Sequence, residues 1–421
     1  MPEYTGKAMF DNSLKLTKIS LWISGIDLSK YKKKISFRKP INTSFLFYFN
    51  FIWLYTLVYG EIYCIYEFIK TGKSFEVISL APFPLICALA TVKAASIYFN
   101  KDIVLLVLNK LRCIHPRIEN EIKEVPNKNG FFQTKSTVSK MHSTDKFLFK
   151  IMIFMCLGAL FVITLFCAVP LVSMAMDYHQ FGRTDLKLPY SVRYFFDPYS
   201  TTWWPFEYLH QVWSSIIVVC NIIGSESLFY AFCVYVRMHF ELLCHDLERL
   251  TDSKHDTAKE LRKLVLRHQE LIELVSQIQE IYSTSMLFNI IISSFTICLC
   301  GFNITDTGTV FAFFNFFLVN MYQIFMVCFF GDMIRSTKVG DAIYKSGWYE
   351  TDKDIKNNVL VIIMRSQKSC TLSAAKFAIL NLSTFTKVNL YITIFLRSTF
   401  YRGVSTNEYR KSIRIVELSF V

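Results

Sequence analysis

The sequence predicts an all-α integral membrane protein with seven transmembrane helices, a cytoplasmic N-terminus and an extracellular C-terminus. Two observations carry this prediction. Of the 421 residues, 52% are hydrophobic and only 19% are charged, whereas an ordinary soluble chain has about 25% charged residues. Runs of roughly twenty apolar residues also alternate with polar, lysine-rich stretches, which is the pattern of a chain that crosses the bilayer repeatedly.

The seven spans are expected at residues 43–69, 77–99, 147–176, 208–237, 280–301, 309–330 and 373–396. The third span is long enough to tilt or to project beyond the bilayer. About seven residues join the fifth and sixth spans, so these two spans must be antiparallel neighbours. The seventh span is the least regular and has four polar interruptions, at Lys376, Asn381, Lys387 and Asn389.

The distribution of basic residues sets the predicted orientation. A cytoplasmic N-terminus places 31 Lys and Arg residues on the cytoplasmic side and 10 on the other side. Because Lys and Arg are enriched in cytoplasmic loops, the reverse orientation is disfavoured. The net charge of +13 is therefore mainly a signal of topology, and we expect no nucleic-acid partner. The first forty residues lack a signal-peptide cleavage site, so the first span is expected to act as its own anchor.

Sequence motifs for catalysis are absent. The chain contains no GxxxxGK[ST], GxSxG, HExxH or GxGxxG pattern, so we expect neither enzyme activity nor a bound cofactor. No CxxC pair or histidine cluster predicts a metal site. Most of the 12 cysteines fall within the spans, where free thiols behave as small apolar groups, and no external disulfide is implied.

Three of the charged residues within the spans could carry function: Glu61, Lys93 and Glu226. A charge at membrane depth costs about 2.5–3.5 kcal/mol on insertion scales, so it usually faces a partner or a wet cavity. Glu61 and Lys93 lie near span ends, and the favoured interpretation is that both snorkel toward the interface. Glu226 lies near the middle of its span, so we expect it to make an internal polar contact.

The outer half of the predicted bundle is rich in aromatic and apolar side chains, which are Phe83, Pro84, Phe166, Met174, Trp213, Phe311, Phe313, Phe314, Phe316 and Phe317. Such a lining suits a small, lipophilic ligand. The alternative interpretation is that these side chains face lipid or a neighbouring helix. Asn303 begins an Asn-Ile-Thr sequon in an external loop and is a candidate for glycosylation.

Two cytoplasmic stretches, residues 239–280 and 331–350, carry amphipathic helical patterns. The fourth and fifth helices are therefore expected to project into the cytoplasm. Packed against their counterparts in other chains, such extensions would form an assembly domain.

The sequence resembles the insect odorant receptor family in three features. The first is the seven-span topology with a cytoplasmic N-terminus. The second is residues 331–350, GDMIRSTKVGDAIYKSGWYE, which resemble the family's pattern of Ser, then Ala-Ile-Tyr, then Ser-x-Trp-Tyr. The third is residues 364–388, MRSQKSCTLSAAKFAILNLSTFTKV, which resemble the family's approach to and start of the last helix.

This resemblance implies a ligand-gated, non-selective cation channel in the plasma membrane of olfactory neurons. In the family, a variable tuning subunit binds a small volatile odorant and a shared co-receptor completes a hetero-oligomer, a tetramer whose last helices line the pore. This chain lacks the long insertion that the co-receptor carries in its second cytoplasmic loop, so it resembles a tuning subunit.

The resemblance also implies candidate site residues. The family's pocket lies in the outer half, among helices two, three, four and six, and the candidate contacts there are Phe83, Cys87, Phe166, Met174, Trp213, Ile217, Phe314 and Phe317. The candidate pore-lining residues are Tyr391, Ile394 and Phe395. After Val388 the chain departs from the family's pattern, and the tail 397–421 is polar, basic and longer than expected.

The chain is accordingly expected to have five parts: a cytoplasmic N-terminal segment (1–42), helices one to four with the odorant-pocket half (43–237), the cytoplasmic extensions with helices five and six (238–372), the pore-lining helix (373–396) and the atypical tail (397–421).

Three alternatives fit less well. The last helix departs from the related gustatory receptor pattern, because Leu390 precedes Tyr391 and Arg397–Ser398 replace Gln-Phe. A G-protein-coupled receptor needs the opposite orientation and usually a disulfide to the external loop, which here has no cysteine. A secondary transporter often has two similar halves with broken spans, and no such paired, broken spans are evident in this sequence.

Overall fold

The computed structural model describes residues 6–28, 43–123, 130–182, 185–251, 257–303, 310–334 and 338–403. Its elements are the α-helices α1 (Gly6–Ser13), α2 (Lys15–Ile23), α3 (Thr43–Lys70), α4 (Ser74–Leu80), α5 (Pro82–Phe99), α6 (Lys101–Lys123), α7 (Gly130–Phe181), α8 (Trp204–Glu248), α9 (Thr257–Asn303), α10 (Val310–Met333), α11 (Lys338–Tyr344), α12 (Lys353–Gln367) and α13 (Leu382–Gly403), the short 3₁₀-helix η2 (Trp348–Glu350), and the strands β1 (Ser373–Ala374) and β2 (Ala378–Ile379).

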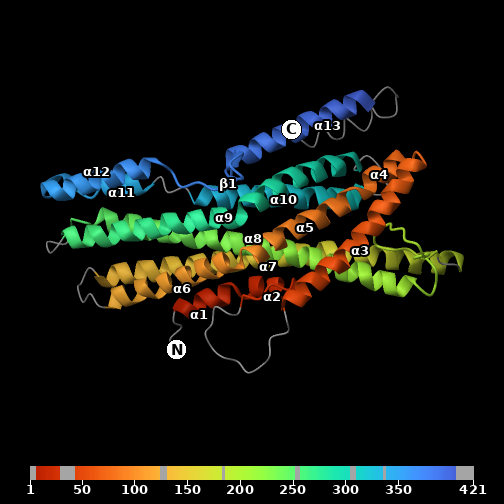
Figure 1. Cartoon of the computed structure of the whole chain (residues 1–421), viewed down its shortest axis with the longest axis horizontal. Helices are drawn as coiled ribbons and strands as arrows, with labels where there is room; N and C mark the ends of the chain where they lie inside the picture. The colour runs from red at the N-terminus through yellow and green to blue at the C-terminus, as the bar shows by residue number, and fades with distance from the viewer. Residues whose placement is uncertain are drawn as a thin grey trace.

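The helices form one elongated bundle in which α7, α8 and α9 run almost the full length (Figure 1). Helix α8 lies at the centre and contacts α2, α3, α5, α7, α9, α10 and α11. In its most apolar stretch 67% of the residues are buried within the chain, against 6% in α7. Helix α7 therefore presents most of its apolar surface outward, where a bilayer would cover it.

Six of the described helices or helix pairs are long and apolar enough to cross a membrane, and they correspond to the first six predicted spans. The second span is not one continuous helix, because α4 ends at Leu80 and α5 starts afresh at Pro82. Proline suits the first position of a helix, since its missing N–H is unpaired there in any case.

The predicted start of the seventh span, at residue 373, is wrong. Residues 373–379 form a short antiparallel hairpin in which Ser373 pairs with Ile379 and Ala374 with Ala378. Helix α13 begins only at Leu382, where the Oδ1 atom of Asn381 accepts a hydrogen bond from the Thr384 backbone N–H at 2.8 Å and caps the helix. Lys376, one of the expected polar interruptions of the seventh span, lies in the hairpin turn with φ of +65° and precedes helix α13.

The expected helical extensions are present. Helix α8 continues to Glu248 and α9 begins at Thr257, and α11 and α12 pack beside them at the same end of the bundle (Figure 1). One apolar core joins these extensions to the adjacent half of the bundle, which we call the inner half after its predicted orientation. Its fully buried side chains include Leu243, Leu274 and Ile343.

The N-terminal helices α1 and α2 lie against the side of the bundle (Figure 1). Phe10 contacts the Tyr235 ring at a centroid distance of 4.9 Å. The Tyr235 hydroxyl donates a hydrogen bond to Asp145 at 2.7 Å and lies 2.6 Å from the Ser13 hydroxyl. Polar contacts between α1, α7 and α8 therefore fix the N-terminal segment beside the inner half of the bundle.

Candidate functional site

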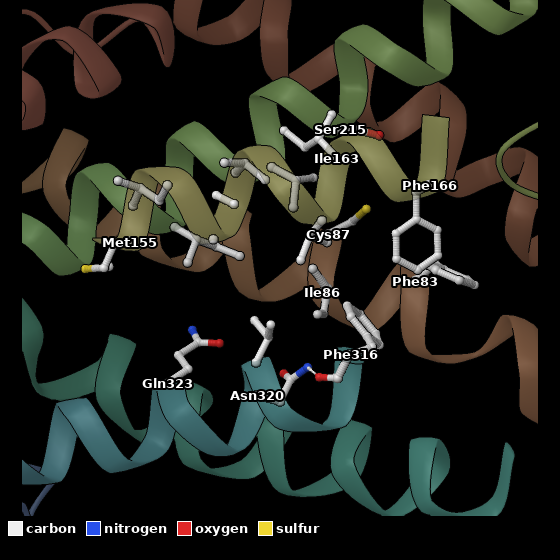
Figure 2. Close-up of a pocket in the computed structure, with 18 of the residues that line it drawn as sticks. Phe83, Ile86, Cys87, Met155, Ile163, Phe166, Ser215, Phe316, Asn320 and Gln323 are labelled. Atoms are coloured by element: carbon white, nitrogen blue, oxygen red, sulfur yellow. Dashed lines mark hydrogen bonds between the residues drawn. The ribbon is translucent and has the colours of Figure 1, made fainter. Parts of the chain in front are cut away.

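A cavity of about 410 Å³ lies in the half of the bundle away from α11 and α12, which we call the outer half after its predicted orientation. Its wall is built by α3, α5, α7, α8 and α10, with one side chain from the loop before α8. Figure 2 shows the cavity between α7 and α8 on one side and α10 on the other. Its volume falls within the roughly 300–1,000 Å³ range of small-molecule sites. It is therefore the candidate ligand site.

An aromatic cluster closes one end of the cavity. Phe83 on α5 and Phe166 on α7 meet edge to face with ring centroids 5.6 Å apart, and both are labelled in Figure 2. Tyr190 lies 5.0 Å from Phe83, and Phe316 on α10 lies 6.1 Å from Phe166. Each aromatic pair at such a distance contributes about 0.5–1.5 kcal/mol of stability beyond that of its buried area. These contacts therefore stabilise this end of the wall.

Tyr190 reaches the cavity from the loop before α8 because Gln211 holds its backbone. The Tyr190 N–H donates to Gln211 Oε1 at 2.9 Å, and Gln211 Nε2 donates to the Tyr190 carbonyl at 3.3 Å. The Tyr190 hydroxyl also lies 3.0 Å from the Ser215 hydroxyl. Sequence reasoning missed Tyr190, because a loop has no periodicity that shows which side chains point inward.

At the opposite end of the cavity, Glu226 and Gln323 line the wall and bond to Lys93, Tyr230 and Asn289. We call these five residues the polar floor. Lys93 and Glu226 form an ion pair with both side chains almost fully buried. Gln323 Nε2 donates to Glu226 Oε1 at 2.6 Å and also lies 3.1 Å from Asn289 Oδ1. The predicted internal contact of Glu226 is thus confirmed. The predicted snorkelling of Lys93 is wrong, because only 1% of this residue is exposed.

The predicted snorkelling of Glu61 is also wrong. Glu61 on α3 is 1% exposed and lines the cavity. It shares a helix face with Leu54, Leu57 and Val58, which pack toward α5 and α8. Its Oε2 atom has no hydrogen-bond partner among the described residues.

The structure places three of the eight candidate contacts on the cavity wall, namely Phe83, Cys87 and Phe166. The other five lie away from the described wall. Met174 Sδ accepts a hydrogen bond from the Lys187 backbone N–H at 3.4 Å, and Phe317 packs near Ile324. Ile217 is buried elsewhere, and Trp213 and Phe314 lie on the bundle surface.

On α8, helical spacing distinguishes the residues that line the cavity from those that do not. Ser215, Val219, Ile222 and Glu226 all line the cavity and recur every three or four residues, so they share one face. Trp213 lies off that face. A choice based on the predicted polar contact of Glu226 would have selected this set, whereas a choice based on aromatic character selected Trp213.

The sequon residue Asn303 is buried at the end of α9. Its Nδ2 donates to the Ile78 carbonyl at 3.1 Å, and its Oδ1 accepts from the Ser79 hydroxyl at 2.7 Å. A glycan on Nδ2 would displace α4 from α9. The structure thus argues against the glycosylation that the sequon suggested.

The candidate pore residues lie on α13, which stands at the side of the bundle against α9 and α10 (Figure 1). Tyr391, Ile394 and Phe395 are each at least half exposed. Ile392, on another face of the helix, is buried against Ile297 of α9. Of the atypical tail, the residues after Gly403 lie outside the described part of the chain.

Two curated proteins of Drosophila melanogaster are similar over most of their length. Odorant receptor 67c is 24% identical over 81% of this chain and 84% of its own. Putative odorant receptor 92a is 25% identical over 82% of this chain and 84% of its own. Among solved structures, the olfactory receptor OR5 of Machilis hrabei in complex with eugenol matches with a TM-score of 0.77 at 15% identity, covering 93% of this chain and 98% of that one.

The structural likeness confirms the helical membrane-protein fold, and the named relatives are receptors rather than enzymes. The model of the family described as 7tm odorant receptor matches residues 74–390, which is well over half of the chain. The chain therefore belongs to the odorant receptor family of multi-pass membrane proteins.

Proposed function

We propose that this chain is an odorant-tuning subunit that binds a small volatile, lipophilic odorant in the cavity described above. With a shared co-receptor it forms a ligand-gated, non-selective cation channel in the plasma membrane of olfactory neurons. The observation that carries this proposal is the apolar cavity of about 410 Å³ in the outer half of the bundle.

The composition of the cavity wall supports a lipophilic ligand. Aliphatic and aromatic side chains of α5, α7, α8 and α10 make up most of the wall, and a few polar groups lie at defined points. Apolar walls with few polar groups are typical of small-molecule sites, in which the polar groups orient the ligand. The Machilis hrabei receptor, which has a similar fold, was solved in complex with the small molecule eugenol, and this supports a small-molecule ligand here.

Access from the bilayer is supported at the junction of α7 and α10. Phe154, Leu318 and Val319 line the cavity and are also 62%, 47% and 42% exposed. The cavity therefore reaches the outer surface of the bundle between these helices. A lipophilic odorant that partitions into the membrane could enter by this route.

Two exposed apolar surfaces support assembly with other subunits. One is the face of α13 that carries Tyr391, Ile394 and Phe395, which we propose to line the pore. The other lies at the predicted cytoplasmic end, on and beside α11 and α12, and consists of Tyr344, Tyr349, Leu360, Val361 and Met364. Large exposed apolar patches mark interaction sites, so we propose that this end is the assembly domain.

The test is co-expression of this chain with the co-receptor in cells that lack other odorant receptors. We expect cation current evoked by members of a volatile odorant panel, with no need for G-protein signalling. A pair that reaches the cell surface as a hetero-oligomer but gives no current with any odorant would contradict the proposal.

A further inference from the structure

Two carboxyl groups line the odorant cavity, and their surroundings differ. Glu226 is paired with Lys93 and accepts hydrogen bonds from Gln323 and Tyr230. Its charge is therefore compensated within the protein. Glu61 is equally buried, but its Oε2 has no hydrogen-bond partner among the described residues.

A basic residue that contacts α3, Arg193, is paired with a different carboxyl group. Arg193, in the loop before α8, forms an ion pair with Glu67, and its backbone N–H donates to the Gly60 carbonyl at 3.1 Å. The guanidinium group thus belongs to a pair at the bundle surface. Glu61 is left as an acidic group on an otherwise apolar stretch of the wall beside Leu57 and Cys87.

A buried carboxyl group without a partner is unfavourable, and a ligand that supplies a partner gains the corresponding free energy. Hydrogen bonds that involve an ionised group are roughly twice as strong as neutral ones. An organic amine provides such a bond, because one proton is shared between its nitrogen and the carboxyl group. Its hydrocarbon part would fill the apolar remainder of the cavity.

We propose that Glu61 is the polar recognition residue of the cavity and that the preferred ligands are small lipophilic amines. This inference rests on the proposed function, since it identifies the class of ligand for the same site. The hydrocarbon portion of the amine lies among the apolar side chains of α5, α7 and α10, and the nitrogen meets Glu61 on α3.

The experiment compares isosteric ligands that differ only in the polar group. Benzylamine and benzyl alcohol form one pair, and hexylamine and 1-hexanol form another. Dose–response curves are measured for cation current in cells that express this chain with the co-receptor. We expect each amine to act at a concentration about tenfold lower than its alcohol, the ratio that corresponds to about 1.4 kcal/mol.

The variant Glu61→Gln keeps the shape of the side chain but cannot share an ionisable proton with an amine. We expect the amine concentration for half-maximal current to rise about tenfold, with the alcohol response unchanged, since only a charge-assisted bond is lost. The matched control is Glu67→Gln on the same helix, which disrupts the pair with Arg193 at the surface and should leave the ratio of amine to alcohol unchanged.

Two outcomes would overturn the inference. One is a pair that responds to alcohols at lower concentrations than to the matching amines. The other is an amine response that Glu61→Gln leaves unchanged. If Glu61→Gln fails to reach the surface, Glu61→Asp keeps the carboxyl group on a shorter side chain and should weaken the amine response alone. Currents evoked only by neutral odorants would thus reject the amine class while leaving the receptor function intact, whereas no current with any odorant would reject the function itself.

Discussion

Along α8, the apolar residues from Leu228 to Leu243 pack into one continuous core, whereas the cavity-lining residues from Ser214 to Glu226 leave space for a ligand. The same helix therefore serves two regions. In the inner half, side chains from α1 to α3, from α5 to α12 and from the first strand meet in a single cluster. In the outer half, the buried apolar residues form only small, separate clusters.

This difference indicates how one bundle can be both stable and responsive. A continuous core transmits strain and resists rearrangement, so the inner half can keep the helices in register. The outer half buries less apolar surface around its cavity and can adjust to a ligand at lower cost. The polar floor lies at the boundary between the two regions, where Glu226 joins α5, α8 and α10.

The largest effect is expected at this boundary. Lys93→Met leaves the Glu226 carboxylate buried without its cation, which should cost about 3–5 kcal/mol of stability. The double variant with Glu226→Gln removes the unpaired charge and keeps a side chain for Gln323, so it should recover most of the loss. Thermal unfolding of the purified protein in detergent, with surface expression as a second measure, provides the test.

The control for this prediction is the pair of Lys263 and Glu260, which lies on the exposed face of α9 with the two charged atoms 3.2 Å apart. Lys263→Met should change stability by less than about 1 kcal/mol, because exposed ion pairs contribute little. Equal effects of Lys93→Met and Lys263→Met would show that the boundary pair is not buried as described.

Substitutions of two valines on α8 allow the inner core and the cavity region to be compared directly. Val236 is fully buried in the inner core, and Val219 lines the cavity. Val236→Ala should cost about 2 kcal/mol from the lost burial of two carbon groups. Val219→Ala should cost less than about 1 kcal/mol, since its side chain already borders empty space, and should instead change odorant sensitivity. Unfolding temperature and dose–response curves together test this contrast, and equal losses of stability would contradict it.

The sequence predicted the regular part of this architecture better than the site. Apolar periodicity and length located the first six spans and the extensions of α8 and α9, because each is a long, repeated signal. The hairpin at 373–379 was missed, since two-residue strands and a left-handed turn at Ala375 and Lys376 leave no pattern within an apolar stretch. The positions of Tyr190 and Glu61 depend on tertiary packing, which spacing along one helix does not reveal.

Two helical glycines also differ between the cavity wall and a packed position, and their substitution is expected to change stability by a smaller amount. Gly158 on α7 lines the cavity, and an added Cβ would meet no atom within 4 Å. Gly158→Ala should therefore stabilise the helix by up to about 1 kcal/mol, because alanine is the better helix former. At Gly224 on α8 the added Cβ would lie 2.8 Å from Leu21 Cδ2 and 3.3 Å from the Leu21 backbone nitrogen. Gly224→Ala should destabilise the protein by about 1 kcal/mol through overpacking, and unfolding shifts of the same sign for both variants would contradict this assignment.

The smallest expected effect is at Asn303, where treatment with a glycosidase should leave the electrophoretic mobility of the protein unchanged. The amide is occupied by hydrogen bonds to Ile78 and Ser79 that tie the end of α9 to α4. Tyr199→Asn supplies the matched positive control, because it creates an Asn-Ser-Thr sequon at a 40% exposed position in the loop before α8.

The engineered site should acquire a glycan if that loop is extracellular, as the basic-residue distribution predicts. Modification at 199 together with an unmodified Asn303 would support both the orientation and the packing of α4 on α9. A glycan on Asn303 would show instead that this outer edge of the bundle is open. The absence of a glycan at 199 in a surface-expressed protein would count against the predicted orientation of the whole chain.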